Sequence, residues 1–142
     1  MIEAKNVGLE EARRIVDAAF KYATTQKPGR PIAVAVLDTT RTIVCMAKQD
    51  GAFPNNVNMA FNKAWTCLHF GLDTRGVRDV LVTGFGYDIY YFGEPGKLAP
   101  IPGGVLLRAG DGTIIGAVGA SGRPADEDEE IVFAAIKTAQ IN

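Results

Sequence analysis

The stretch that decides the fold is PGGVLLRAGDGTIIGAVGASG, residues 102–122. Two apolar runs, Val105–Leu107 and Thr113–Val118, flank the segment Ala109–Gly112, which reads Ala-Gly-Asp-Gly. Apolar, β-branched runs on either side of Asp-Gly are typical of a β-hairpin, because glycine supplies the positive φ angle of a tight turn. Further glycines indicate close approach by packed helices or by a ligand. We expect Gly103 and Gly104 to form a ligand wall, and Gly116, Gly119 and Gly122 to let helices or a second subunit approach the sheet.

The rest of the chain supplies helices and a second hairpin. Ile32–Leu37 and Thr42–Ala47 are apolar runs of strand length joined by a polar turn. Hairpins in place of crossover connections favour a mainly antiparallel sheet and the α+β class. The other predicted elements are a first helix capped by Asn6, a central helix from Asn55 or Asn56 to about Phe70, a short helix over Thr74–Thr83 capped by Thr74, a short strand at Ile89–Phe92 and a last helix beginning at Pro124.

Composition limits the class of protein. The chain has 142 residues, which predicts a single domain over 1–142. Apolar residues make up 47% of the chain, and the net charge of −1 provides no basic surface for nucleic acid or for a membrane. Two cysteines are too few for a disulfide framework. The N-terminal residues show no apolar core of a signal peptide, so we expect a cytoplasmic protein.

Lys63 is the main candidate for chemistry, because it falls inside the apolar face of the central helix with Thr66 one turn away. Such a lysine either extends its ammonium group to water along apolar surface or places it in a pocket wall. A pocket lysine can act as a base, an electrophile or an imine former. A carboxylate at the start of the last helix, Asp128 or Glu129, would orient it. The predicted catalytic residues are Lys63 and Glu129.

We expect the ligand pocket to lie between the central helix and the glycine hairpin. The backbone N–H groups of Gly103 and Gly104 can form an anion nest, and the aromatic segment 87–92 can close over a flat ring. A small aromatic or carboxylated molecule would suit a cation, a nest and an aromatic wall. The expected ligand-binding residues are Asn56, Asn58, Lys63, Thr66, Tyr87, Tyr90, Pro102, Gly103 and Gly104.

Several of these motifs together resemble the GlcG/HbpS family, also described as haem-degrading or PduO C-terminal-like proteins. The resemblance covers nearly the whole chain and rests on Asp50–Ala52 (DGA), Lys63–Thr66 (KAWT), and the Pro-Gly-Gly…Gly-Ala-x-Gly-x-Ser-Gly…Asp-Glu string that ends at Asp128–Glu129. It implies a five-stranded antiparallel sheet flanked by helices, profilin-like, in a homo-oligomer that is a dimer or larger. It also implies a small ligand, since some relatives bind haem or accompany cobalamin metabolism.

The chain departs from the family pattern on the central helix. Relatives usually have a small or polar residue, an aspartate and an arginine where this chain has Asn56, Asn58 and Phe61, while Lys63 and Thr66 are retained. Because amides and an aromatic ring replace charged residues at these positions, we expect the site to prefer a ligand that differs from those of the relatives.

Haem needs an axial donor, and His69 is the chain's one histidine. No His, Cys or Asp spacing resembles a structural zinc site, so no metal is expected unless haem binds through His69. The favoured function is binding of haem, a corrinoid or a small metabolite, with no cofactor certain. The alternative is a cofactor-independent lyase or isomerase that acts on a small aromatic or carboxylated metabolite through a pocket lysine.

Overall fold

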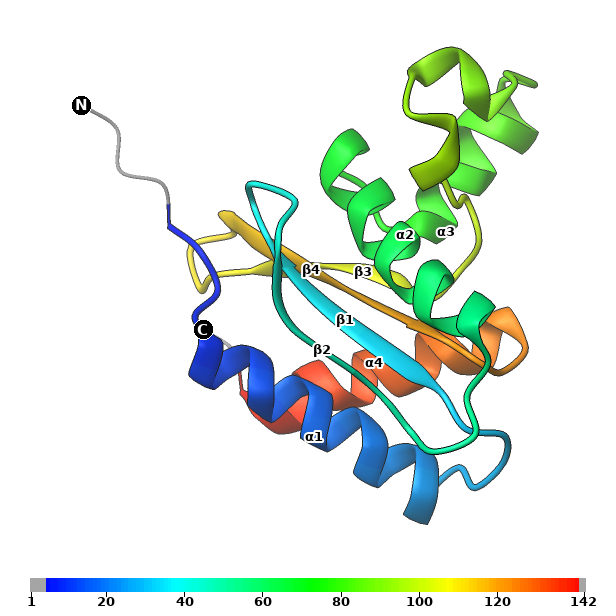
Figure 1. The fold of residues 1–142 in the computed structure, drawn as a ribbon. Helices are drawn as coiled ribbons and strands as arrows, with labels where there is room; N and C mark the ends of the chain where they lie inside the picture. The colour runs from blue at the N-terminus through cyan, green and yellow to red at the C-terminus, as the bar shows by residue number, and fades with distance from the viewer. Residues whose placement is uncertain (1–4, 141–142) are drawn as a thin grey trace.

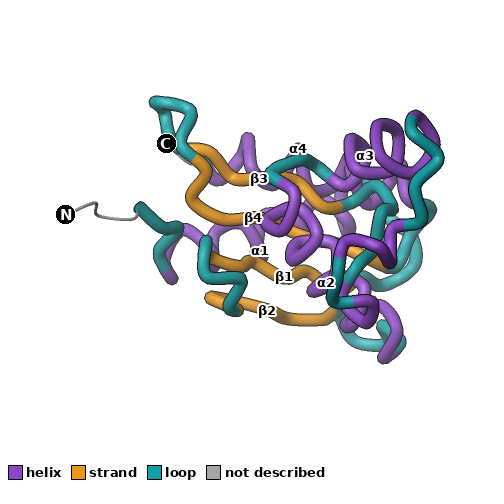
Figure 2. Tube along the Cα trace, turned by 90° about the horizontal axis from the view of Figure 1, so that it is seen from above, coloured by secondary structure: helices purple, strands orange, loops and turns teal. Residues whose placement is uncertain are grey.

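The structure is a computed structural model that describes residues 5–140. A four-stranded antiparallel sheet forms the centre of the molecule (Figure 1). The strand order is β2-β1-β4-β3, so the two hairpins meet through β1 and β4. Two helices, α1 and α4, cover one face and α2 lies on the other (Figures 1 and 2). The strands are β1 (Ala33–Asp38), β2 (Ile43–Lys48), β3 (Gly104–Arg108) and β4 (Ile114–Ser121), and the main helices are α1 (Leu9–Thr25), α2 (Pro54–Phe70) and α4 (Ala125–Ala139).

The strand side chains alternate between two apolar layers, as a sheet covered on both faces requires. Val34, Val36 and Val118 pack with α1 and α4, whereas Ala33, Ala35 and Leu37 pack with α2. The sequence therefore predicted both hairpins and the α+β class correctly. The number of strands was wrong, because the sheet within residues 5–140 has four strands rather than five.

The predicted strand at Ile89–Phe92 is a 3₁₀ helix, η2. The side chain of Asp88 accepts a hydrogen bond from the backbone N–H of Tyr90, which starts a helical turn instead of an extended strand. Within η2 only Ile89 is buried, so the segment has no apolar face to pair with the sheet. Local capping by an aspartate thus prevailed over the β-propensity of the aromatic residues.

Helix starts were also misplaced by one or two residues. The helix α1 begins after Gly8, while the Asn6 side chain accepts hydrogen bonds from Thr39 in the β1–β2 turn. The helix α2 begins at Pro54. Asn56 lies in its first turn, and the side chain of Asn56 accepts a hydrogen bond from the backbone N–H of Phe53. Proline at the first position explains this start, since its missing N–H costs nothing there.

The predicted helix over Thr74–Thr83 exists as two pieces. The single turn α3 (Thr74–Gly76) follows an Asp73 cap and runs into the π-helical segment η1 (Val77–Gly84). The hydroxyl of Thr74 does not cap the helix but accepts from the backbone N–H of Gly104 at 2.9 Å. The segment from η1 to the 3₁₀ turn η3 (Pro95–Lys97) projects beyond the sheet layers (Figure 1).

Candidate functional site

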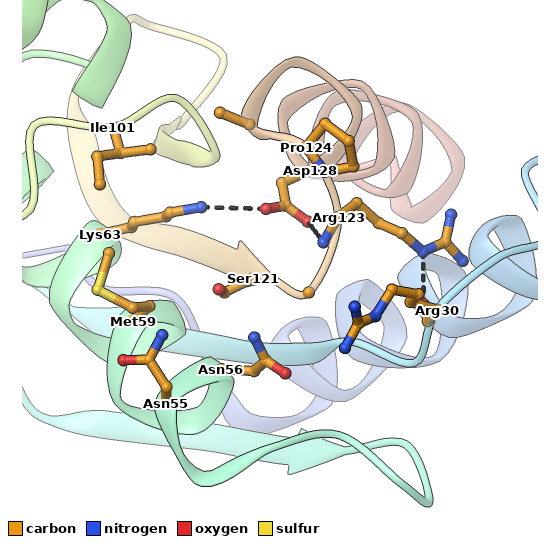
Figure 3. Close-up of a pocket in the computed structure, with 12 residues that line it drawn as sticks. Arg30, Asn55, Asn56, Met59, Lys63, Ile101, Ser121, Arg123, Pro124 and Asp128 are labelled. Carbon is orange, nitrogen blue, oxygen red and sulfur yellow. Dashed lines mark hydrogen bonds and ion pairs between the residues drawn. The ribbon is translucent and has the colours of Figure 1, made fainter.

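The centre of the candidate site is a buried ion pair between α2 and α4. Lys63 is 2% exposed, and its Nζ donates a hydrogen bond to Oδ2 of Asp128 at 3.1 Å (Figure 3). It also donates to the backbone oxygen of Ala120 at 2.9 Å. Ala120 lies near the end of β4, so the ammonium group joins three elements that are far apart in the sequence. The lysine does not extend to water, and the ion pair sits among the wall residues of a cavity.

Asp128 is held from two directions in the first turns of α4. Its Oδ1 accepts from the backbone N–H of Arg123 at 3.0 Å, and its Oδ2 faces Lys63. Burial raises the pKa of Asp128 to about 6, although the Lys63 ammonium group partly opposes this. Burial also lowers the pKa of Lys63, with Asp128 acting in the opposite direction. Both shifts bring the pKa values of Lys63 and Asp128 closer together, so a proton passes between the two groups at a lower free-energy cost.

Gly103 provides the space in which the ion pair lies. Its φ angle is +125°, a conformation that side chains rarely adopt, and a Cβ atom there would lie 2.8 Å from Nζ of Lys63 and 3.1 Å from Cβ of Asp128. Glycine is therefore required at this position by both the backbone and the ion pair.

A cavity of about 510 Å³ opens beside the pair, between the start of α2, the end of β4 and the start of α4. It holds amide, hydroxyl and thioether side chains together with three apolar ones, and Arg30 and Arg123 add positive charge to that of Lys63 (Figure 3). The lining residues are Arg30, Asn55, Asn56, Met59, Lys63, Ile101, Ser121, Gly122, Arg123, Pro124, Ala125 and Asp128.

Arg123 fixes the rim of this cavity. Its side chain is 3% exposed, and its guanidinium donates to the backbone oxygens of Ala23, Lys27 and Arg30 as well as to Glu127. These bonds attach the turn between α1 and β1 to the start of α4. Because the same residue's N–H holds Asp128, one arginine positions both Arg30 and the carboxylate.

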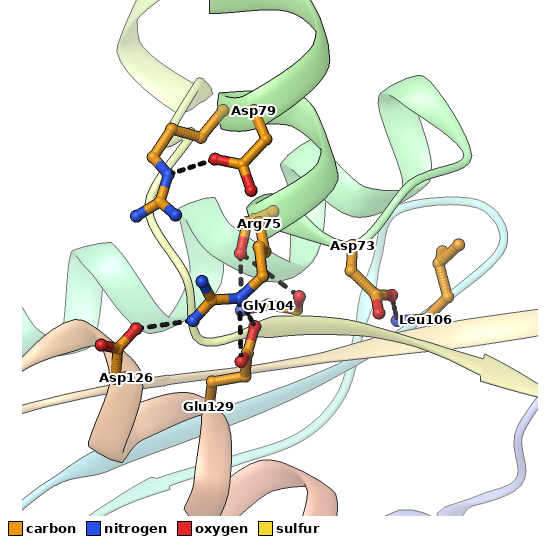
Figure 4. Close-up of polar contacts among 9 residues, drawn as sticks. Asp73, Arg75, Asp79, Gly104, Leu106, Asp126 and Glu129 are labelled. Carbon is orange, nitrogen blue, oxygen red and sulfur yellow. Dashed lines mark hydrogen bonds and ion pairs between the residues drawn. The ribbon is translucent and has the colours of Figure 1, made fainter. Parts of the chain in front are cut away.

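The structure brings together some of the predicted site residues. Lys63 and Asn56 line the cavity, and Gly103 contacts the ion pair. The predicted catalytic carboxylate is placed elsewhere: Glu129 pairs with Arg75 on α3, at 3.0 Å, and Asp126 pairs with the same arginine (Figure 4). The side chain next to Lys63 is Asp128, the alternative to Glu129.

The other predicted ligand-binding residues do not line this cavity. Thr66 is fully buried, donating to the Asn62 carbonyl and accepting from the Ala99 N–H. Gly104 packs on α2, where a Cβ would lie 2.6 Å from the Lys63 carbonyl oxygen, and its N–H is bound to Thr74, so no anion nest forms. The remaining four are outside the cavity walls: Asn58, Tyr87 and Tyr90 are exposed, and Pro102 is buried.

Sequence reasoning missed several cavity residues. Met59, Ser121 and Arg30 line the cavity but are absent from the ligand-binding residues expected from the sequence. A usable pattern was present on α2, because Asn56, Met59 and Lys63 are spaced three and four residues apart and so share one helix face. Ser121 and Arg30 come from other elements, which the sequence alone does not bring together.

His69, the predicted haem ligand, is engaged at both ring nitrogens. Its Nε2 lies 2.8 Å from the Phe92 carbonyl oxygen and its Nδ1 lies 3.1 Å from Nη1 of Arg41. Since a carbonyl accepts and a guanidinium donates, the imidazole has its proton on Nε2 and no free lone pair for iron. The ring also stacks on Trp65, with 4.8 Å between centroids.

Cys67 is fully buried, and burial raises the pKa of its thiol, so it is not a thiolate donor. Among residues 5–140, no cluster of three or more His, Cys, Asp or Glu side chains could hold a metal ion. Over the same residues, none of the helices has the length and apolar character that a membrane span needs.

Several solved structures share this fold. Klebsiella pneumoniae protein ORFY, of family DUF336, is 20% identical with a TM-score of 0.86, over 99% of this chain and 94% of that chain. A PduOC:haem complex is 25% identical with a TM-score of 0.83, over 94% of each chain. A double mutant of HbpS from Streptomyces reticuli is 25% identical with a TM-score of 0.82, over 96% of this chain and 89% of that one.

No curated protein sequence matches the chain significantly. A family model, described as haem-degrading protein HbpS-like, matches residues 7–137, which is most of the chain. By this match and by the fold it shares with HbpS and PduOC, the chain belongs to the HbpS-like family.

Proposed function

We propose that this protein binds a small anionic metabolite in the cavity beside Lys63 and Asp128, and that it does so in the cytoplasm. The observation that carries the proposal is the buried ammonium group of Lys63, which is paired with the Asp128 carboxylate and lies in the wall of a cavity of about 510 Å³. That volume is within the usual range of small-molecule sites. A carboxylate ligand can pair with the Lys63 ammonium group alongside Asp128, so the charge of the ligand meets an opposite charge inside the cavity wall.

The other lining groups favour a compact ligand with one polar end. The amides of Asn55 and Asn56 and the hydroxyl of Ser121 can donate to carboxylate or carbonyl oxygens. Met59 and Ile101 offer apolar surface to a short aliphatic or aromatic part. Arg30, exposed and stacked over the Phe53 ring at 5.4 Å, adds positive charge that attracts an anion.

The proposal is tested by titrating the protein with pyruvate and with benzoate while recording amide chemical shifts. We expect shifts centred on Lys63, Ser121 and Gly122. In the double variant Lys63→Met/Asp128→Leu, which removes both charges, the affinity should fall by roughly tenfold or more, as expected for a lost bond to a charged group. Lys48→Met, at an exposed lysine on β2, is the matched control and should bind normally. Equal binding by the double variant would contradict the proposal.

Binding should also depend on pH through Asp128. Because burial raises the pKa of Asp128 to about 6, the carboxyl takes up a proton as the pH falls through that value. At fixed Lys63 protonation, this adds one positive charge to the site. We therefore expect pyruvate, which stays ionised, to bind roughly tenfold more tightly at about pH 5 than at about pH 7.5. Calorimetric titration at the two pH values measures this, and tighter binding at the higher pH would contradict it.

Haem is the second candidate, supported by the family description and by the haem complex of PduOC. His69 does not fit as its ligand, since both nitrogens are engaged, whereas the Met59 thioether lines the cavity and would be the iron donor there. In a haem titration followed by the Soret band, we expect Met59→Leu to weaken the change and His69→Ala to preserve it. A Soret change lost only in His69→Ala would place the haem at His69 instead.

We also propose that the protein assembles as a homo-oligomer. The projecting segment exposes large aromatic side chains, with Phe85 64% and Tyr91 84% accessible. Exposed apolar surface of this kind is typical of contacts between proteins. Light scattering coupled to size exclusion measures the assembly, and a monomer at all concentrations would contradict the proposal.

A further inference from the structure

We propose that Lys63 forms an imine with the carbonyl carbon of an aldehyde or 2-oxo acid bound in the cavity. This inference rests on the proposed function, because it names the reactive class among the anions that the cavity would bind. It follows from the position of the lysine: a buried amine in a cavity wall, with a proton acceptor at 3.1 Å.

Lys63 differs from the other described lysines in its surroundings. Lys5, Lys21, Lys48, Lys97 and Lys137 are exposed and Lys27 is half-buried, so water stabilises their ammonium form. Lys63 is 2% exposed, and burial lowers its pKa, which increases the fraction of nucleophilic amine. Of its three N–H groups, the Ala120 carbonyl and Asp128 accept two. No third acceptor of Nζ occurs among the described residues, so one N–H is left for a ligand in the cavity.

Asp128 has the properties of a proton shuttle for the reaction. Its carboxyl, with a pKa raised to about 6, can take a proton from the neighbouring ammonium at less cost than a carboxyl in water. The bond from the Arg123 N–H to Oδ1 holds the carboxyl so that Oδ2 faces Nζ. Ser121, whose hydroxyl lies in the cavity beside the pair, can donate to the carbonyl oxygen (Figure 3).

The step balances without another reactant. Lys63 first gives one proton to Asp128, and the amine lone pair then attacks the carbonyl carbon. The carbonyl π electrons move to oxygen, which takes the proton from Asp128. The nitrogen gives a second proton to Asp128, and the hydroxyl takes that proton and leaves as water while the C=N bond forms. The product is a protonated imine paired with the Asp128 carboxylate, so the buried pair has the same charges before and after.

This chemistry separates the chain from a simple carboxylate binder. A protonated imine withdraws electrons from the adjacent carbon, which is how lysine-dependent lyases and isomerases activate their substrates. The inference therefore gives a chemical basis to the alternative of an enzyme with a pocket lysine.

The test is reductive trapping in the wild-type protein. We incubate it with pyruvate or 4-formylbenzoate and sodium cyanoborohydride, then locate the adduct by peptide mass spectrometry. The expected product is a single adduct on Lys63, found in the peptide that spans residues 49–75, because trypsin does not cleave after an alkylated lysine. Adduct spread over the exposed lysines, with no excess on Lys63, would overturn the inference. Mapping in the wild type does not depend on any variant folding.

Two comparisons complete the experiment. Lys63→Arg keeps a cation beside Asp128 but cannot form an imine, and it should lose the adduct, whereas Lys48→Arg should retain it. Lactate and benzoate, which lack an aldehyde or ketone carbonyl, should bind without any adduct. If these acids and pyruvate all shift the cavity amides but no adduct forms on Lys63, the imine is wrong and the proposed binding function stands. If neither shifts nor adduct occur, both are wrong.

Discussion

The Gly119→Ala variant should lose about 3 kcal/mol or more of its free energy of unfolding, and it is expected to accumulate poorly as folded protein. Gly119 lies in β4 opposite α2, and a Cβ atom there would overlap the carbonyl oxygen of Ala60 and approach the backbone nitrogen of Ala64 at 2.9 Å. Both obstacles are helix backbone, which cannot rotate away as a side chain can. The methyl group therefore has to move α2 away from the sheet.

Urea unfolding followed by circular dichroism measures this loss. The matched control is Gly110→Ala, in the turn of the same hairpin, where an added Cβ meets nothing within 4 Å. The control should change stability by less than about 1 kcal/mol. Because α2 carries Lys63, any Gly119→Ala protein that does fold should also bind pyruvate more weakly. Equal stability of the two variants would show that the space between β4 and α2 accommodates a methyl group, and would contradict this prediction.

The hairpin over residues 102–122 was predictable from sequence because turn chemistry and strand pattern are local. The role of its glycines was predictable only in part, at Gly119 but not at Gly104, since packing and ligand contact require the same small residue. The structure separates them: Gly104 and Gly119 allow α2 to approach, while Gly103 makes room for the ion pair. Only the positions of α2 and α4 relative to the sheet decide between the two uses.

The candidate site was predictable in part for the same reason. The position of Lys63 in an apolar helix face identified it from sequence, but its partner depends on the rotation of α4. Asp128 and Glu129 are consecutive, so they point about 100° apart on a helix, and only one can face Lys63. The first turn of α4 also holds Asp126 and Glu127, so no apolar residue there indicates which side of the helix faces the protein interior.

The second large effect is expected from breaking the ion pair on one side. Asp128→Ala leaves the buried Lys63 ammonium group with only the Ala120 carbonyl, and it removes the acceptor of the Arg123 N–H. Removal of one partner of a buried pair costs about 3–5 kcal/mol, because the other charge stays desolvated. Urea unfolding at neutral pH should show a loss of this size. Asp126→Ala is the matched control, since Asp126 is 83% exposed and pairs with Arg75 at the surface. It should cost less than about 1 kcal/mol.

The double variant Lys63→Met/Asp128→Leu distinguishes the energy of the pair from the cost of an unpaired charge. Apolar side chains of similar size leave no buried charge, so the double variant should lie within about 2 kcal/mol of the wild type and above Asp128→Ala alone. That result would mean that stability does not require the two charges. The charged pair would then be explained by the ligand chemistry of the cavity, and the double variant should unfold normally while it fails to bind pyruvate. A double variant that loses the sum of both single losses would instead show that the pair holds α2 and α4 together, and would weaken the case for a binding site.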